Sequence, residues 1–302
     1  MPIRLGYACI NQHLSDTQKL TSSRTMRKAT FQAKGLPAVS DLIISNLSSL
    51  EKIMQWNAKN GFTLYRMSST MFPWASEYQL NQLPDYIEIR NKLSSIGQFA
   101  IDNGIRLSFH PGQFVCLGSQ TKKVVDNAIQ DLEIHGLLMD LMHQPRDHNA
   151  KINIHIGGAY NDKPGTAKRF LQNADRLSTS VYDRLTVEND DRPNLYTTQE
   201  LHDMIYVEAG IPIVFDYHHH MCNPGNLSER DALALAISTW YNVKPCTHYS
   251  ESAQDEGRAA PLRAHSRYIY KKIDDYGFDI DCIVEAKAKE QAVLKYNNDH
   301  GV

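Results

Sequence analysis

The sequence predicts an α/β protein that forms a single (β/α)8 TIM barrel, and three observations lead to this fold. Short apolar or β-branched runs recur about eight times along the 302 residues. Each run is followed by a longer stretch with the apolar spacing of an amphipathic helix. Strand and helix alternating at this rate are typical of a (β/α)8 barrel. No Pro/Gly/Ser-rich linker or low-complexity tract divides the chain, so we expect one domain over residues 1–302.

The eight predicted strands are short and rich in apolar or β-branched residues. In chain order they are IRLGYACI (3–10), FTLYRMS (62–68), IRLSFH (105–110), KINIHI (151–156), RLTVEN (184–189), IPIVFDY (211–217), KPCTHYS (244–250) and DCIVEAK (281–287). A doubly wound open sheet is the alternative arrangement. No GxGxxG or GxxxxGK[ST] phosphate loop follows the first strand, which favours the barrel.

The predicted helices have apolar residues three and four positions apart. They include the segments 40–61, 86–104, 123–142, 229–240 and 263–277. The first two end in Asn-Gly, a common helix stop.

Composition excludes several classes of protein. The net charge is -2, so nucleic-acid binding would require a local basic patch. The apolar runs are too short to span a membrane, and the first ten residues lack the apolar run of a signal peptide. The cysteines show no CxxC pair, which suits a reducing compartment; they are Cys9, Cys116, Cys222, Cys246 and Cys282. We therefore expect a cytoplasmic monomer that does not bind membranes.

Ionisable or amide side chains stand at the carboxyl ends of the predicted strands. In order they are Asn11, Arg66 or Ser68, His110, His155, Glu188, Asp216, His248 and Glu285. All strand ends of a barrel meet at one rim, where carboxylates without partners would repel one another and raise each other's pKa. Divalent cations bind carboxylate and imidazole together and remove this repulsion. The pattern predicts metal ligands that include Asp216 and at least one of His218, His219 and His220.

Metal-rich barrel mouths serve sugar isomerases and epimerases as well as phosphodiester hydrolases. Composition and periodicity do not choose between these classes. The segment 22–31 carries Arg24, Arg27 and Lys28 without an acid, and Lys287 and Lys289 follow the last strand. These cations could bind phosphates, although a solvated basic loop would look the same. The HPGQF segment adds Gln113 and Phe114, an amide and an aromatic suited to insertion into a base stack.

Eight short segments in this order resemble the UV damage endonuclease family and cover nearly the whole chain. They are LGYACIN, YRMSS, HPGQF, INIHIGG, LTVEND, VFDYHHH, THYSES and IVEAKAKEQA. The resemblance implies a barrel similar to endonuclease IV with three divalent metal ions, usually Mn²⁺, with Zn²⁺ or Mg²⁺ as alternatives. It implies incision of damaged double-stranded DNA immediately 5′ to UV photoproducts (cyclobutane pyrimidine dimers and 6-4 photoproducts), leaving a 3′-hydroxyl and a 5′-phosphate. Some members also cut at abasic sites.

The resemblance also assigns roles to individual residues. Glu188 would bridge two metals at a catalytic centre that includes His110 and Asp216. One bridged metal would be held by Asp216, His248 and Glu285, the other by His110 and His155. His219 and His265 would hold the third metal.

The expected DNA contacts follow from the same resemblance. Tyr7 and Asn11 would line the lesion pocket. Gln113 and Phe114 match a Gln-Tyr pair that enters the stack at the lesion, and here Phe lacks the hydroxyl. The expected phosphate contacts are Arg24, Arg27, Lys28 and Lys287.

A second position, after Phe114, departs from the family pattern. A lysine often stands two residues before the histidine of the HYS segment, and it can be carboxylated to help bind metal. Here Cys246 occupies that position and the lysine is Lys244. The departure changes the ligand set available to the third metal, and a thiolate there would favour a softer ion such as Zn²⁺.

Two other functions remain as alternatives. A sugar isomerase or epimerase would share the barrel and much of the ligand set, but it would need a more enclosed pocket and no basic loop. A damage-binding protein without catalytic activity would bind DNA and leave it intact.

Overall fold

The barrel strands are found where the sequence predicts them. The computed structural model describes residues 3–301, and each strand lies inside its predicted range. The strands are β1 (Arg4–Ala8), β2 (Leu64–Arg66), β3 (Arg106–Ser108), β4 (Ile152–Ile154), β5 (Leu185–Glu188), β6 (Ile213–Val214), β7 (Cys246–Tyr249) and β8 (Asp281–Val284).

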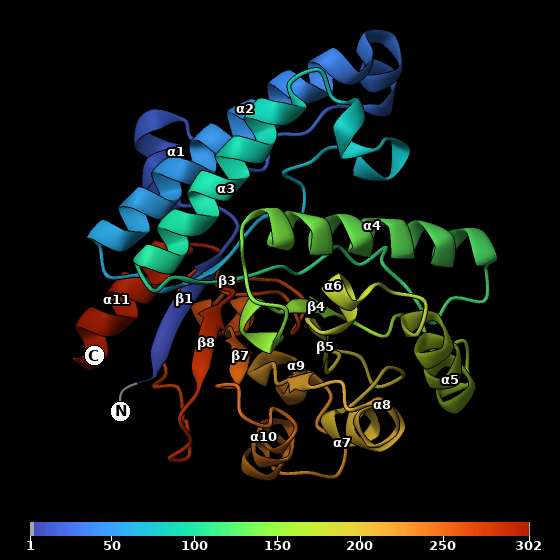
Figure 1. The fold of residues 1–302 in the computed structure, drawn as a ribbon. Helices are drawn as coiled ribbons and strands as arrows, with labels where there is room; N and C mark the ends of the chain where they lie inside the picture. The colour runs from blue at the N-terminus through green and yellow to red at the C-terminus, as the bar shows by residue number, and fades with distance from the viewer. Residues whose placement is uncertain (1–2, 302) are drawn as a thin grey trace.

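Neighbouring strands pair in parallel, and together they close into a barrel. One sheet has the order β3-β2-β1-β8-β7 and the other β4-β5-β6. Two parallel bridges, Phe109 to Ile152 and Asp216 to His248, join the sheets. Because both open edges are paired in this way, the eight strands form a ring at the centre of the molecule (Figure 1). The carboxyl ends of all eight strands therefore face the same rim.

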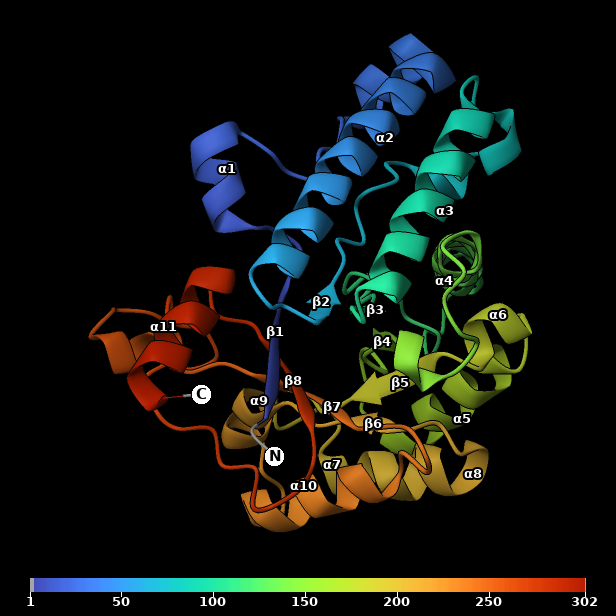
Figure 2. The same cartoon turned by 60° about the vertical axis from the view of Figure 1, so that its left-hand side comes forward.

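Helices surround the strands in both views (Figures 1 and 2). They are α1 (Gln12–Gln18), α2 (Lys28–Lys59), α3 (Tyr86–Asp102), α4 (Lys122–Leu141), α5 (Lys163–Ala174), α6 (Thr179–Tyr182), α7 (Thr198–Leu201), α8 (Val207–Ala209), α9 (Tyr217–Cys222), α10 (Glu229–Ser238) and α11 (Glu290–His300). Helices α2 and α3 run side by side and extend beyond the strands (Figure 2). None of the helices within residues 3–301 combines the length and apolar character needed to cross a membrane.

Four predicted helices correspond to α2, α3, α4 and α10. The largest difference between prediction and structure is at the start of α2. The predicted segment 40–61 covers only the second part of this helix, which begins at Lys28. Gly35 has non-helical backbone angles (φ 63°, ψ -159°) and Pro37 follows it, so two helical pieces meet at a kink. The short first piece lacks a long apolar face, which is why periodicity did not reveal it.

The predicted helix at 263–277 is wrong: this segment is an irregular chain. Two carboxylates hold its backbone amides instead of helical carbonyls. Glu256 accepts from the amides of residues 267 and 268 at 2.9 Å, and Glu251 accepts from those of 270 and 271 at 2.8 Å. Ile269 and Ile273 are buried, so their i, i+4 spacing resembled a helical face.

A compact group of ions closes the amino end of the barrel. Asp281 is fully buried and accepts hydrogen bonds from Arg4 Nε at 2.8 Å and Arg106 Nη1 at 2.9 Å. Lys244 Nζ lies 3.3 Å from the same carboxylate. Burial opposes ionisation of Asp281, but the two arginines outweigh it and hold its pKa below the usual value. Lys244 therefore belongs to the amino end of the barrel, opposite the predicted metal site.

Candidate metal centre

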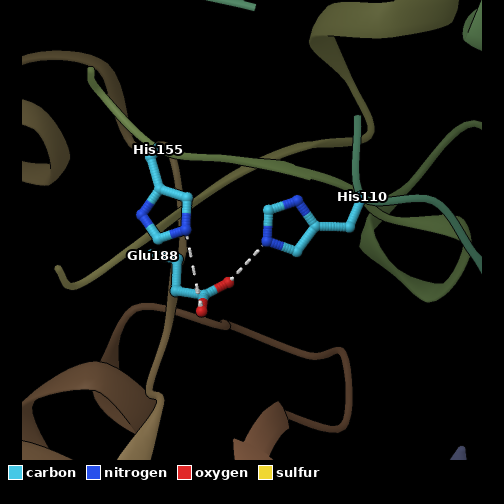
Figure 3. Close-up of side chains that lie close together, drawn as sticks. All are labelled: His110, His155 and Glu188. Atoms are coloured by element: carbon cyan, nitrogen blue, oxygen red, sulfur yellow. Dashed lines mark ion pairs between the residues drawn. The ribbon is translucent and has the colours of Figure 1, made fainter. Parts of the chain in front are cut away.

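The carboxyl ends of five neighbouring strands surround one carboxylate. Glu188 ends β5 and is fully buried. His110 follows β3 and His155 follows β4, and both rings point toward Glu188 (Figure 3). His248 lies in β7. Asp216 follows β6, and its side chain accepts the backbone amide of His219 at 2.8 Å to cap α9. The capped turn aims His219 back at the same centre.

Four imidazoles approach the two oxygens of Glu188. His248 Nδ1 and His110 Nε2 lie 3.0 and 3.1 Å from Oε2. His219 Nδ1 lies 3.2 Å and His155 Nε2 3.9 Å from Oε1. Neighbouring ligand atoms on one cation with bonds of about 2.0–2.2 Å are themselves separated by roughly 3 Å. The spacing of these atoms is therefore that of a ligand shell.

Several buried atoms at this centre have no hydrogen-bond partner in the described part of the chain. They include Glu188 Oε1, Asp216 Oδ2 and His248 Nδ1. A buried polar atom without a partner costs about 1–3 kcal/mol, and a cation would satisfy several such atoms at once. The donor set of carboxylate oxygens and imidazole nitrogens thus fits a divalent metal ion.

Two groups of side chains could each hold a metal ion. One is His110, His155 and Glu188, and the other is Glu188, Asp216 and His248. Within each group the ligand atoms lie within 4.8 Å of one another. Glu188 belongs to both groups, and its Oε2 lies close to a histidine of each, His110 and His248.

Glu285 lies beside the second group and belongs to neither. Its Oε1 is 3.3 Å from His248 Nδ1, and the same oxygen forms an ion pair with Arg66 at the end of β2. Burial would raise the pKa of Glu285, but Arg66 and His248 outweigh it and hold the pKa well below its usual value. The guanidinium of Arg66 therefore already neutralises one of the predicted metal ligands, Glu285.

The residues predicted to hold the third metal lie farther apart than those of the first two groups. His219 and His265 have ring centroids 6.4 Å apart, and His265 Nδ1 is 3.8 Å from Glu285 Oε2. In residues 3–301, neither histidine joins two further ligands closely enough to form a third group. Of the three consecutive histidines, His219 alone lies within 4 Å of Glu188 in the described chain, and His220 packs beside Phe215.

Outer contacts fix the orientation of the candidate ligands. Asn153 donates to Glu188, and His219 Nδ1 lies 2.9 Å from the carbonyl oxygen of Asn189. Pro111 O lies 3.1 Å from His110 Nδ1 and Asp190 Oδ1 lies 3.0 Å from His155 Nδ1, and acceptors on these nitrogens leave Nε2 of each ring free to face a metal. Lys151 Nζ lies 3.0 Å from His248 Nε2.

Lys151 is a site residue that the sequence interpretation missed. It precedes β4, is fully buried, and contacts the ring of His248. Cys246, which stands where a family lysine was expected, joins neither group of candidate ligands. Instead it packs in an apolar cluster that contains Val214 and Trp240. The lysine at the start of the predicted KINIHI strand was the available signal for Lys151.

Protons share the site with the carboxylates. Burial is the largest cause that raises the pKa of Asp216, and Glu188 and Glu285 add to it. Burial opposes protonation of His155, but Glu188 and Asp190 outweigh it and raise the pKa of His155 to about 9. Protons on these side chains must leave when a cation binds.

Comparison with known proteins identifies the family. Residues 3–300 match the family described as UV-endonuclease UvdE. The chain belongs to this family. It is 35% identical over 303 residues to the UV-damage endonuclease of Schizosaccharomyces pombe, covering 97% of this chain and 50% of that protein. The chain therefore spans about half the length of this curated relative.

Solved structures agree with the barrel fold. The crystal structure of SacUVDE has a TM-score of 0.84 at 29% identity, covering 98% of this chain and 99% of that one. Endonuclease IV from Thermus thermophilus has a TM-score of 0.56 at 13% identity, covering 83% and 93% of the two chains. The second likeness concerns the fold alone, and it matches the endonuclease IV-like barrel that the sequence predicts.

The rim of this UvdE-family chain presents an exposed aromatic beside the candidate ligands. Phe114 is 83% exposed, the largest exposed fraction among the large hydrophobic side chains of the described residues. Gln113 beside it is also exposed. Gln113 lines a hollow of about 450 Å³ whose wall reaches His155 and His219. A large apolar ring in water at the edge of a site is a contact surface.

Tyr7 and Asn11 do not line an open pocket in this conformation. Both are fully buried. The Tyr7 hydroxyl donates to Asn57 Oδ1 at 2.6 Å and accepts from Asn11 Nδ2 at 2.9 Å. Asn11 Oδ1 accepts the backbone amide of Leu14 at 2.9 Å and caps α1. In this conformation their polar atoms stabilise the start of α1, and direct contact with a lesion stays a prediction.

The predicted basic residues have different surroundings. Arg24 donates to the carbonyl of Lys19 at 2.9 Å and to Ser49 Oγ at 3.0 Å, so it braces its own loop. Arg27 and Lys287 are exposed. Lys28 is also exposed and lies 3.6 Å from Glu77. Arg27, Lys28 and Lys287 are accessible to a phosphate, whereas the guanidinium of Arg24 is already engaged.

Proposed function

We propose that this protein is a metal-dependent endodeoxyribonuclease that incises damaged double-stranded DNA immediately 5′ to UV photoproducts. The products would be a 3′-hydroxyl and a 5′-phosphate, and abasic sites would be further substrates. Membership of the UV-endonuclease UvdE family supports the reaction class. The observation that carries the proposal is Glu188, which is shared by two groups of potential metal ligands.

The proposed metal set follows the ligand groups. Two divalent cations, most suitably Mn²⁺, would share Glu188, with His110 and His155 on one side and Asp216 and His248 on the other. Glu285 would complete the second set, and His219 with His265 would hold a third ion. Bound cations would supply an activated water and Lewis acidity toward the phosphodiester.

The side chains prepare the site for an anionic substrate. Burial would raise the pKa of Glu188, but His248 and His155 outweigh it and hold the pKa well below its usual value. Glu188 is therefore ionised and available for coordination at neutral pH. Outer partners such as Asn153 hold it in one rotamer, so little reorganisation is required when substrate arrives.

Recognition would occur at the rim. Phe114 would enter the base stack beside the lesion, with Gln113 contacting the exposed base edges. The two damaged nucleotides would then turn toward the mouth. A photoproduct already weakens stacking, so opening the duplex there costs less than in intact DNA. Arg27, Lys28 and Lys287 would hold backbone phosphates along the approach.

The decisive experiment is incision of an end-labelled duplex that contains one thymine dimer, incubated with the protein and Mn²⁺. We expect a single nick immediately 5′ to the dimer, a product with a 3′-hydroxyl, and no cleavage after chelation. The undamaged duplex is the control. Binding without nicking in every metal tested would indicate a damage-binding protein, and isomerisation of free sugars without DNA cleavage would indicate a sugar isomerase or epimerase.

A further inference from the structure

Lys289 has an unusual backbone conformation at the barrel mouth. It lies between β8 and α11, with φ 56° and ψ -126°. A non-glycine residue in a sparsely populated region of this kind is strained and persists only where the surroundings enforce it. Here the amide of Lys289 donates to Ala286 O at 3.1 Å, and the amide of Ala292 donates to Lys289 O at 3.0 Å. Glycine would fit this position without strain.

The side chain of Lys289 is partly buried beside the candidate metal centre. Arg66, Glu285, Glu290 and Cys9 are the ionisable groups close enough to act on it. Burial lowers the pKa of Lys289. Among residues 3–301 no carboxylate lies within 4.0 Å of its amine, because Glu285 forms its ion pair with Arg66 instead. The amine thus has no anionic partner within ion-pair distance in the described chain.

Glu290 next to it is engaged elsewhere. Its two oxygens accept the backbone amides of Gln12 and His13 at 2.7 and 2.6 Å. Both carboxylates near Lys289 are therefore committed to other donors. A partly buried ammonium group that its own protein leaves uncompensated is suited to an external anion.

We propose that Lys289 binds a phosphodiester oxygen of the damaged strand, while Arg66 holds Glu285 in position. This inference rests on the proposed function. Arg66 ends β2 and Lys289 follows β8, on either side of β1, so both lie at the rim that also presents Glu285. A phosphodiester held at the candidate metal ligands would then lie within reach of the Lys289 amine.

Lys287 is the less suitable of the two lysines after β8. It is exposed, and its amide donates to Ser266 O at 3.0 Å in an ordinary loop contact. Its charge would contribute to general attraction of DNA along the approach. A phosphate at the centre requires an amine that the fold holds in place. Of the two lysines, Lys289 is partly buried and meets this requirement, whereas Lys287 is exposed.

The test uses the variants Lys289→Gly and Lys289→Gln in the full chain. For Lys289→Gly we expect an unchanged or higher Tm, since strain is removed, together with a 10- to 100-fold loss of incision of the thymine-dimer duplex. Binding of the same duplex in EDTA should show a salt slope smaller by about one, as expected for the loss of one phosphate contact. Lys289→Gln should lose the same phosphate contact, and Lys289→Arg should restore part of the binding.

Lys19→Gly is the matched control, because Lys19 also has a positive φ (58°) at the end of α1. This variant should keep wild-type incision and the wild-type salt slope. If wild type nicks the dimer duplex and Lys289→Gln retains both its rate and its salt slope, the phosphate role is overturned. If wild type itself does not nick, the proposed function fails, and the salt slope in EDTA still decides whether Lys289 contacts DNA.

Discussion

Each end of the barrel buries a carboxylate, and the groups that surround this carboxylate differ between the two ends. At the amino end, the buried carboxylate of Asp281 has Arg4, Arg106 and Lys244 within hydrogen-bonding or ion-pair distance. At the carboxyl end, Glu188 is equally buried and has no Arg or Lys in an ion pair among the described residues. Its neighbours are imidazoles and an amide.

This difference separates stability from function. A buried carboxylate needs compensating charge or hydrogen bonds, because desolvation costs several kcal/mol. At the amino end the chain provides the cations itself, and nothing remains for a ligand to satisfy. At the carboxyl end the compensation comes from imidazoles, which can also bind metal, and several buried oxygen and nitrogen atoms have no hydrogen-bond partner among the described residues. The first arrangement is structural, and the second is suited to binding metal ions.

The strongest test of this contrast is Glu188→Gln. We expect incision to fall by about 10³–10⁴-fold, because an amide cannot bridge two cations as a carboxylate does. Binding of the dimer duplex should be largely retained, and the Tm of the metal-free protein should change little. Rate assays with Mn²⁺ and thermal melts with chelator measure the two quantities. Full activity would remove Glu188 from the centre.

The matching change at the amino end is Asp281→Asn. It leaves Arg4 and Arg106 without a buried anion, and we expect a loss of about 3–5 kcal/mol in the free energy of unfolding. Since the pKa of Asp281 is depressed in the fold, its stabilisation is present above the unfolded pKa and is lost as pH falls through the folded pKa. Chemical denaturation at pH 7 and at acidic pH measures both effects. Per folded molecule, incision should stay normal; a selective loss of incision would contradict the division between the two ends.

Periodicity was sufficient for the barrel and for the strand-end residues. A strand end is fixed by where the apolar run stops, so His110, His155 and Glu188 could be placed at one rim before any coordinates. Contacts that cross between distant segments could not be predicted in this way. Lys151 precedes β4 and reaches His248 in β7, although β5 and β6 lie between these strands in the ring. Its role therefore depends on the closure of the barrel.

The same limit applies to the wrong helix and to the burial of two predicted site residues. The segment 263–277 has helical spacing, but carboxylates from a preceding loop hold its amides, and no local pattern reveals such distant acceptors. Tyr7 and Asn11 matched a family motif, whereas their hydrogen bonds to each other and to Asn57 bury them. A motif indicates where a residue lies along a strand. Whether its side chain is exposed depends on how α1 and α2 pack over the end of that strand.

Metal binding should release protons, since the pKa of His155 is raised to about 9. In the metal-free protein the charge on His155 stabilises the fold fully below its unfolded pKa, and this contribution is lost as pH rises through about 9. A cation must displace that proton at pH 7, so affinity should fall about tenfold per unit as pH decreases below 9, for one coupled proton. Titration calorimetry of Mn²⁺ in buffers of different ionisation enthalpy measures the release. Asp190→Asn removes one cause of the raised pKa of His155 and should therefore reduce the number of protons released. Equal proton release by the wild type and this variant would contradict the assignment of the proton to His155.

The smallest effect on stability is expected at the rim, where Phe114 is in water. Phe114→Ala should change the free energy of unfolding by less than about 0.5 kcal/mol, because the ring buries little surface. The preference for dimer-containing over intact duplex should fall about tenfold, the value of one lost aromatic–base stack. Competition binding with chelator measures this preference apart from chemistry, and Tyr160→Ala, at another exposed aromatic, is the control. An unchanged preference would show that the carboxyl end selects lesions through the metal centre alone.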